Sequence, residues 1–251
     1  MNIDPVISIV TGTRNRPNDF RRLVDSIEAG TTIEWELVVS DASDSPLELE
    51  DVATDETWPR IRIIPERPRL GCTKGYNVAF RAARGEFVLW ANDDAILEHG
   101  CADNAVQFMR DHPEIGMGAI PYAEPRRPRY QVNSYFGMIY GNFGIVRREC
   151  GEQVGWFDEE FPMYGNDNSF AFRVLLAGKG ILEVPNARMF HFATDDAHRA
   201  ENNNQAQRIR DVERLVEKYG PHMAEMRATY KRCGGPLFGH EQSPDWARQA
   251  V

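Results

Sequence analysis

Three polar side chains follow a short apolar run near the middle of the chain. The run Phe87–Trp90 has a strong β preference, and Asn92, Asp93 and Asp94 come directly after it. Because the run is too short for a helix, we predict a buried central strand of a parallel sheet. Adjacent carboxylates repel one another unless solvent or a cation screens them, and Mg²⁺ commonly binds one or two carboxylates together with substrate phosphates. The pattern indicates either a metal–diphosphate site or a solvated turn whose acids cap a helix.

Two further apolar runs end in polar loops and are predicted to lie beside the central strand. The run Val6–Thr11 leads into the turn at 12–17, and Trp35–Ser40 leads into the loop at 41–46. Because strands that alternate with helices form a parallel sheet with right-handed crossovers, the loops after all three strands fall on one edge. Open α/β sheets bind ligands at this edge. We therefore expect an α/β fold with a doubly wound, mostly parallel sheet and a nucleotide across these loops.

The other elements follow from hydrophobic periodicity and from capping residues. Asn18 is a plausible N-cap for the first helix, and Gly30 ends it. The segment Pro121–Tyr130 is rich in proline and arginine, so we expect a mobile loop, either solvated or clamping a phosphorylated or acidic ligand. Helices are predicted at 18–29, 73–84, 99–111, 168–177 and 206–219, and further strands at 61–64, 115–120 and 187–192.

Composition narrows the class of protein. The 251 residues are 42% hydrophobic and carry a net charge of −9, which argues against nucleic acid or an anionic membrane as the main partner. Four widely spaced cysteines without a CxxC pattern are expected to be reduced thiols of a cytoplasmic protein. We expect no integral membrane segment and no signal peptide, since no apolar run is long enough to span a bilayer.

Several ordered blocks of the sequence resemble the family 2 glycosyltransferases, which have the GT-A fold. Residues 6–17 resemble the first strand and nucleotide loop of that family, and residues 36–44 resemble its second strand, whose terminal aspartate faces the base. Residues 69–79 are similar to the "NxGxxxGxN" helix start, and 92–94 lie at the DXD-like metal motif. Residues 154–167, VGWFDEEFPMYGND, resemble the segment "VGxFDExF…YGED", whose final aspartate is the general base.

The resemblance implies an inverting transfer from a nucleoside-diphosphate sugar, with Asp167 as the catalytic base. Without the resemblance, Asp167 would be a helix N-cap, and His191 would be a satisfied core histidine. With it, Asp94 and His191 become the expected ligands of a divalent metal, Mn²⁺ or Mg²⁺. Asn166 stands where the family usually has a glutamate that contacts the acceptor.

The resemblance also implies donor and acceptor contacts. Asp41 either accepts a hydrogen bond from a base imide, which favours uridine or thymidine, or closes an Asx-turn in its own loop. Lys74 either faces the diphosphate or is a solvated surface cation. Trp156 could stack on the face of a sugar, with Asn166 beside it on the acceptor side. The residues expected to bind the nucleotide are Thr11, Thr13, Arg14, Asp41, Lys74, Asn92 and Asp93.

We therefore predict a GT-A catalytic domain over residues 1–195 and a helical extension over 196–251. The nucleotide-binding half is expected at about 1–95 and the acceptor-side half at about 96–195. The expected donor is UDP- or dTDP-linked, and the acceptor is a sugar, a lipid-linked compound, a small molecule or a protein. Three roles stay open for the extension: packing on the catalytic domain, forming a homodimer contact, or shaping the acceptor site.

Two other functions fit parts of the sequence. A sugar nucleotidyltransferase also uses a nucleotide-binding α/β sheet and carboxylates, but 11–14 matches its glycine-rich loop only in part. A catalytically silent nucleotide-sugar-binding protein is the other alternative, because Asn166 departs from the family pattern.

Overall fold

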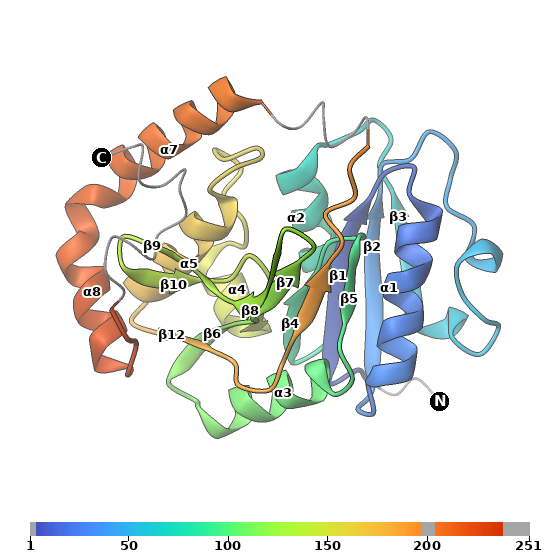
Figure 1. Ribbon diagram of the computed structural model, residues 1–251, viewed down its shortest axis with the longest axis horizontal. Helices are drawn as coiled ribbons and strands as arrows, with labels where there is room; N and C mark the ends of the chain where they lie inside the picture. The colour runs from blue at the N-terminus through green and yellow to red at the C-terminus, as the bar shows by residue number, and fades with distance from the viewer. Residues whose placement is uncertain (1–3, 197–203, 238–251) are drawn as a thin grey trace.

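A seven-stranded sheet forms the centre of the computed structural model, which describes residues 4–196 and 204–237 (Figure 1). Its strand order is β12-β6-β11-β4-β1-β2-β3. β11 runs antiparallel to both neighbours, whereas the other neighbouring pairs are parallel. The sheet is therefore mostly parallel, as predicted. Its strands are β1 (Ile7–Thr13), β2 (Trp35–Asp41), β3 (Ile61–Pro65), β4 (Phe87–Trp90), β6 (Ile115–Ala119), β11 (Gly144–Arg147) and β12 (Gly180–Glu183).

Helices cover both faces of this sheet because alternate strand residues point to opposite sides. Ile9 of β1 belongs to one apolar core with α1 (Pro17–Gly30) and α3 (Cys101–Asp111). Val10, the next residue, belongs to the opposite core with α2 (Cys72–Ala82) and α5 (Asn166–Leu176). The doubly wound arrangement follows directly from this alternation.

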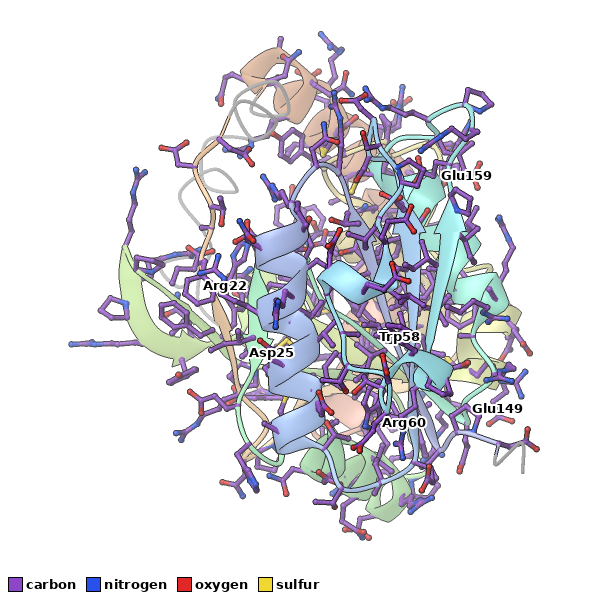
Figure 2. All side chains as sticks on the ribbon, turned by 90° about the vertical axis from the view of Figure 1, so that its right-hand side faces the viewer. Arg22, Asp25, Trp58, Arg60, Glu149 and Glu159 are labelled. Carbon is purple, nitrogen blue, oxygen red and sulfur yellow. The ribbon has the colours of Figure 1, made fainter. Side chains whose placement is uncertain are left out.

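The first helix begins at a different residue from the predicted one. α1 starts with Pro17, its N-cap is Arg16, and no side chain caps it, so the prediction of Asn18 as N-cap was wrong. Proline is favoured at the first helical position because its fixed φ suits the helix and its missing N–H would be unpaired there. Arg22 and Asp25 lie on the outward face of α1 in the side view (Figure 2).

A second, four-stranded sheet has the order β5-β13-β7-β8. β7 (Tyr122–Glu124) and β8 (Arg127–Gln131) form a hairpin where the sequence predicted a loop. β8 lies at the sheet edge and is exposed along its whole length, so Pro128 sits where its missing N–H is tolerated. The other two strands are β5 (Ala95–Leu97) and β13 (Met189–His191).

The C-terminal part of the described chain is helical, as predicted. α7 (Gln205–Tyr219) and α8 (Met223–Arg232) follow the edge of the domain near α5 (Figure 1), and Met226 and Tyr230 of α8 are fully buried in the core. The parts of the predicted extension at 197–203 and 238–251 lie outside the described residues. No helix in the described ranges has the length and apolar character needed to span a bilayer. The remaining short elements are β9 (Asn133–Tyr135), β10 (Met138–Tyr140), α4 (Arg148–Val154), η1 (Leu49–Asp51), η2 (Trp58–Arg60) and η3 (Gly220–His222).

Candidate active site

A cavity of about 1390 Å³ opens at the carboxyl edge of the large sheet. Its walls come from the β1–α1 loop, the end of β4, the β7–β8 hairpin, the start of α5 and one side of α7. Asp94 and Asp167, which are far apart in sequence, both line it. The space exceeds the 300–1,000 Å³ of a typical ligand site, so it suits two substrates together.

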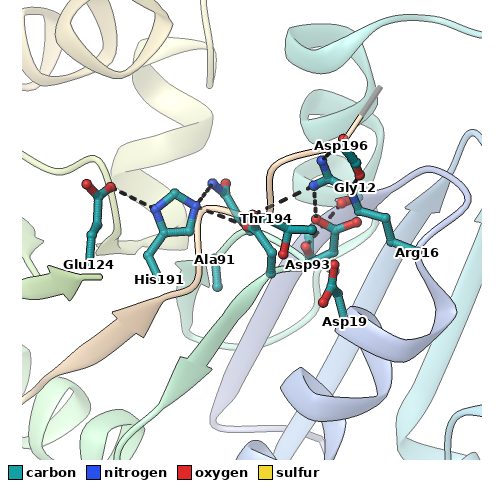
Figure 3. Close-up of polar contacts among 12 residues, drawn as sticks. Gly12, Arg16, Asp19, Ala91, Asp93, Glu124, His191, Thr194 and Asp196 are labelled. Carbon is teal, nitrogen blue, oxygen red and sulfur yellow. Dashed lines mark hydrogen bonds and ion pairs between the residues drawn. The ribbon is translucent and has the colours of Figure 1, made fainter. Parts of the chain in front are cut away.

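The two acids after β4 have different surroundings. Asp93 is buried, accepts a hydrogen bond from Thr13 Oγ1 at 2.9 Å, and pairs with Arg16 Nη1 at 3.2 Å (Figure 3). Burial raises the pKa of Asp93 to about 6, although the Arg16 guanidinium opposes the shift. Arg16 also donates two hydrogen bonds to the Asp196 carboxylate, from Nε at 2.7 Å and from Nη2 at 2.8 Å. The β1–α1 loop is thus tied to the segment that follows β13.

His191 joins Asp94 to the second sheet. Its Nε2 lies 3.0 Å from Asp94 Oδ1, and its Nδ1 lies 3.0 Å from Glu124 Oε1 (Figure 3). Burial lowers the pKa of His191, but hydrogen bonds to the two carboxylates raise it more, so the net shift is upward. Burial likewise raises the pKa of Asp94, and hydrogen bonds from His191 and the Thr194 N–H bring it below its ordinary value.

The Asp94–His191 pair fits a hard divalent cation. In protonated His191, Nε2–H donates to Asp94 and Nδ1–H to Glu124. A divalent cation would take the place of the Nε2 proton, between the ring nitrogen and the Asp94 carboxylate, while Nδ1–H stays with Glu124. Ligand atoms about 2.1 Å from an ion and at right angles to each other lie about 3 Å apart, which is the observed spacing. Within residues 4–196 and 204–237 no cluster of three metal-ligating side chains occurs. These side chains would therefore supply two ligands, and phosphate or water the rest.

Asp167 sits in the first turn of α5, on another wall of the cavity. The helix is preceded by Gly165, whose φ of +82° is in the left-handed region that favours glycine. Asp167 Oδ1 accepts the Asn168 N–H at 2.8 Å, and burial raises the pKa of Asp167 to about 6. Asn166 lies beside it, with Oδ1 accepting the Asp167 N–H at 2.8 Å and Nδ2 donating to Thr73 Oγ1 at 3.0 Å. Asn166 thus orients the backbone that carries Asp167.

Only some of the predicted nucleotide residues reach the cavity. Thr13, Arg14, Asn92 and Asp93 line it, whereas Thr11, Asp41 and Lys74 do not. Asp41 is fully buried, and its carboxylate accepts the N–H groups of Ser43 and Leu47 at 2.9 and 3.0 Å. The second interpretation, an Asx-turn, is therefore what the structure contains. Lys74 is exposed outside the cavity, as expected of a solvated surface cation.

Trp156 does not face the acceptor side of the cavity, contrary to the prediction. Its ring is 4% exposed and stacks on Phe80 at a centroid distance of 4.8 Å and an interplanar angle of 6°. The aromatic ring is used for core packing between α2 and α5, and the neighbouring Phe157 lines the cavity instead.

Four residues of the site were not singled out in the sequence. Arg16 and Glu124 hold the acids and the histidine described above. The Tyr76 hydroxyl donates to the Ala91 carbonyl at 2.8 Å and lies 3.0 Å from Asn92 Oδ1. Arg208 of α7 lines the far wall. Arg16 could have been predicted, because it lies in the loop at 12–17 that the sequence placed at the ligand-binding edge of the sheet. Glu124 of β7 and Arg208 of α7 reach the cavity because distant segments of the chain pack together. No local sequence pattern predicts that contact.

Comparison with known proteins identifies the family. A family model described as "Glycosyl transferase family 2" matches residues 8–172, more than half of the chain. The chain belongs to glycosyl transferase family 2. The matched region contains Asp93, Asp94 and Asp167, whereas His191 and α7 lie beyond it.

Two curated proteins are similar to this glycosyltransferase family 2 chain. The O-antigen biosynthesis protein RfbC of Myxococcus xanthus is 27% identical over 223 residues, covering 74% of the chain and 17% of RfbC. The uncharacterized protein MT1568 of Mycobacterium tuberculosis (strain CDC 1551 / Oshkosh) is 28% identical over 117 residues, covering 47% of the chain and 36% of that protein. The chain thus spans well under two thirds of the length of either relative.

Solved structures share the architecture. TarS residues 1–349 of S. aureus superposes with a TM-score of 0.63 at 17% identity, covering 90% of this chain and 71% of that one. The mannosyltransferase PcManGT of Pyrobaculum calidifontis superposes with a TM-score of 0.60 at 18% identity, covering 99% of this chain and 68% of PcManGT. The fold predicted from the sequence, GT-A, is therefore confirmed.

Proposed function

We propose that this chain transfers a sugar from a nucleoside-diphosphate donor to an acceptor hydroxyl, with inversion at the anomeric carbon and with Mn²⁺ or Mg²⁺ as cofactor. The observation that carries the proposal is the presence of the Asp94–His191 pair and of Asp167 on different walls of one cavity. Related structures support it: TarS was solved with UDP-GlcNAc, and PcManGT with GDP-Man and Mn²⁺.

Asp167 is the proposed general base. A base works best when its pKa lies near the working pH, and burial has raised the pKa of Asp167 to about 6. Its carboxylate would accept the proton of the acceptor hydroxyl as that oxygen attacks the anomeric carbon. Asn166 holds the Asp167 backbone through the amide N–H, so the base is positioned by its neighbour and by Thr73.

Asp94 and His191 are the proposed metal ligands, and Glu124 fixes the orientation of the His191 ring. The cation, when bound, would neutralise the charge that develops on the departing diphosphate. Asn92, Asp93, Thr13 and Arg14 line the same part of the cavity and are proposed to bind the donor. The preference for uridine or thymidine is not kept, because Asp41, on which it rested, closes its own loop.

The predicted division of the chain stays part of the proposal, with a catalytic domain at 1–195 and an extension at 196–251. α7 lines the cavity with Arg208, Val212 and Leu215, which supports the view that the extension shapes the acceptor site. A cytoplasmic location is also proposed, since all four cysteines are unpaired thiols, as in a reducing compartment.

A ligand panel followed by a turnover assay tests the proposal. The melting temperature should increase when UDP, dTDP or GDP is added with Mn²⁺ or Mg²⁺. A chelator should reverse the increase. A nucleotide at about a hundredfold excess over its dissociation constant stabilises the folded state by about 2.7 kcal/mol. Release of a nucleoside diphosphate from the matching sugar nucleotide should then require Asp167.

Other outcomes distinguish the alternatives. Release of pyrophosphate would indicate a sugar nucleotidyltransferase. Metal-dependent nucleotide binding without turnover of any sugar nucleotide would indicate the catalytically silent binding protein. No stabilisation by any nucleoside diphosphate with either metal would refute the donor site itself.

A further inference from the structure

An arginine of α7 faces the cavity and has no carboxylate partner in the part of the chain that the structure describes. Arg208 is half-buried, lines the cavity, and holds its guanidinium carbon 4.8 Å from the centroid of the Tyr164 ring. Tyr164 stands three residues before Asp167, so Arg208 lies on the wall from which the proposed base acts. The cation–π contact holds the guanidinium in place, and no described carboxylate pairs with its N–H donors.

Three other arginines that line the cavity form ion pairs. Arg16 contacts Asp93, Arg69 contacts Asp44, and Arg127 contacts Glu124. Among the residues that the structure describes, Arg208 forms no ion pair. Asp211, the carboxylate one turn further along α7, is fully buried and instead accepts Gln207 Nε2 at 2.7 Å and the Tyr164 N–H at 3.4 Å.

The hairpin on the second sheet adds a similar group. Arg126, between β7 and β8, is exposed, lines the same cavity, and has no ion pair among the residues described at 4–196 and 204–237. The chain carries a net charge of −9, yet these two arginines of the cavity have no carboxylate partner among the described residues. A guanidinium removed from water favours an anion that can accept two parallel N–H bonds.

We propose that the acceptor carries an anionic group, a phosphate or a carboxylate, which Arg208 binds with the help of Arg126. This inference rests on the proposed function, because it assigns the wall formed by α7 and the start of α5 to the acceptor. The metal pair and the loops after β1 and β4 take the donor at the other wall, so the acceptor hydroxyl lies near Asp167 and its charged group near α7. The anion can belong to a phosphorylated or acidic glycan or to the diphosphate of a lipid-linked sugar.

The test uses a carbohydrate array with four classes of probe: neutral glycans, phosphorylated glycans, uronic acid glycans, and sugars linked to a short prenyl chain through diphosphate. Wild type, Arg208→Gln, Arg208→Lys and the control Arg210→Gln are compared with and without a nucleoside diphosphate and Mn²⁺. Arg210 is exposed on the same helix, lies outside the cavity and donates to Gln207.

Wild type should bind anionic probes in preference to neutral ones, and Arg208→Gln should lose that binding by about tenfold or more, as expected for a lost hydrogen bond to a charged group. Arg208→Lys should retain part of it, and Arg210→Gln all of it. The probe class that binds identifies the source of the anion.

Three results would overturn the inference: no binding to any anionic probe, equal binding by Arg208→Gln and wild type, or a loss of nucleotide affinity in Arg208→Gln in place of glycan affinity. Nucleotide binding is measured on the same samples. If wild type fails to bind nucleotide, the proposed function fails, whereas retained nucleotide binding with no anionic glycan refutes only the role of Arg208.

Discussion

Replacing Asp167 by asparagine should separate activity from stability. The change keeps the size of the side chain and the acceptor for the Asn168 N–H, but it removes the carboxylate that would take the acceptor proton. General-base catalysis contributes about 10²- to 10⁴-fold, so the transfer rate should fall by about that factor. In wild type the rate should follow ionisation of a group with a pKa of about 6: about a tenth of the molecules are active at pH 5, about half at pH 6 and nearly all at pH 8.

The same burial makes ionised Asp167 costly for the fold. Its pKa is raised from 3.8 to about 6, so the folded protein binds this proton more tightly than the unfolded chain. The free energy of unfolding should therefore fall between about pH 4 and pH 6 and stay lower above that range, by up to about 3 kcal/mol. Asparagine carries no charge and avoids this cost. Asp167→Asn should melt above wild type at pH 8 and close to it at pH 4.

The assay pairs nucleoside diphosphate release with thermal melting from pH 4 to pH 8.5. Asp25→Asn is the matched control, since Asp25 is exposed on the outer face of α1 (Figure 2) and should change neither measurement. A variant that keeps more than about a tenth of the wild-type rate at pH 8 would refute Asp167 as the base. A melting temperature below that of wild type at pH 8 would refute the argument from burial.

Three further changes test other parts of the structure. Glu124→Gln removes the carboxylate that orients the His191 ring, so Mn²⁺-dependent nucleotide affinity, measured by calorimetry, should fall about 10- to 100-fold; an unchanged affinity would exclude the orienting role. Asp41→Ala leaves two backbone N–H groups without their acceptor and should lower the free energy of unfolding by about 2 kcal/mol in urea titrations, whereas a base-reading aspartate would leave it unchanged. Gly144→Ala places a Cβ 2.5 Å from Trp90 Cη2, so it should cost about 1–3 kcal/mol by the same measurement, and a neutral result would mean that β11 and β4 are less closely packed than described.

Strand polarity was enough to predict where the site lies. β1, β2 and β4 are parallel neighbours, with Val10 opposite both Val38 and Trp90, so the loops after them meet at one edge. The apolar runs predicted these strands correctly because a central parallel strand is buried on both faces and therefore has an almost continuous apolar sequence. The resemblance of 154–167 to a family motif added Asp167, which lines the same cavity, and its role as base stays a prediction.

Side-chain direction was harder to predict than position along the chain. Asp41 ends β2 as expected, but the path of its loop brings two N–H groups onto the carboxylate, and that path is not encoded in spacing. Trp156 lies in the expected segment, yet its ring is buried in the core, where it stacks on Phe80. β8 was missed because an exposed edge strand buries neither face, so its sequence has no hydrophobic alternation to detect, and its partner β7 has only 3 residues.

The wall formed by α7 has a consequence for how such a protein could diversify. The region shared with the family ends at residue 172, while Arg208, Val212 and Leu215 reach the cavity from a helix further along the chain. Exchanging that helix between relatives would change the surface that faces the proposed acceptor, and it would leave the spacing between Asp94 and Asp167 intact. Chimeras joined after β13 should therefore inherit their nucleotide preference from the first parent and their choice of recipient molecule from the second.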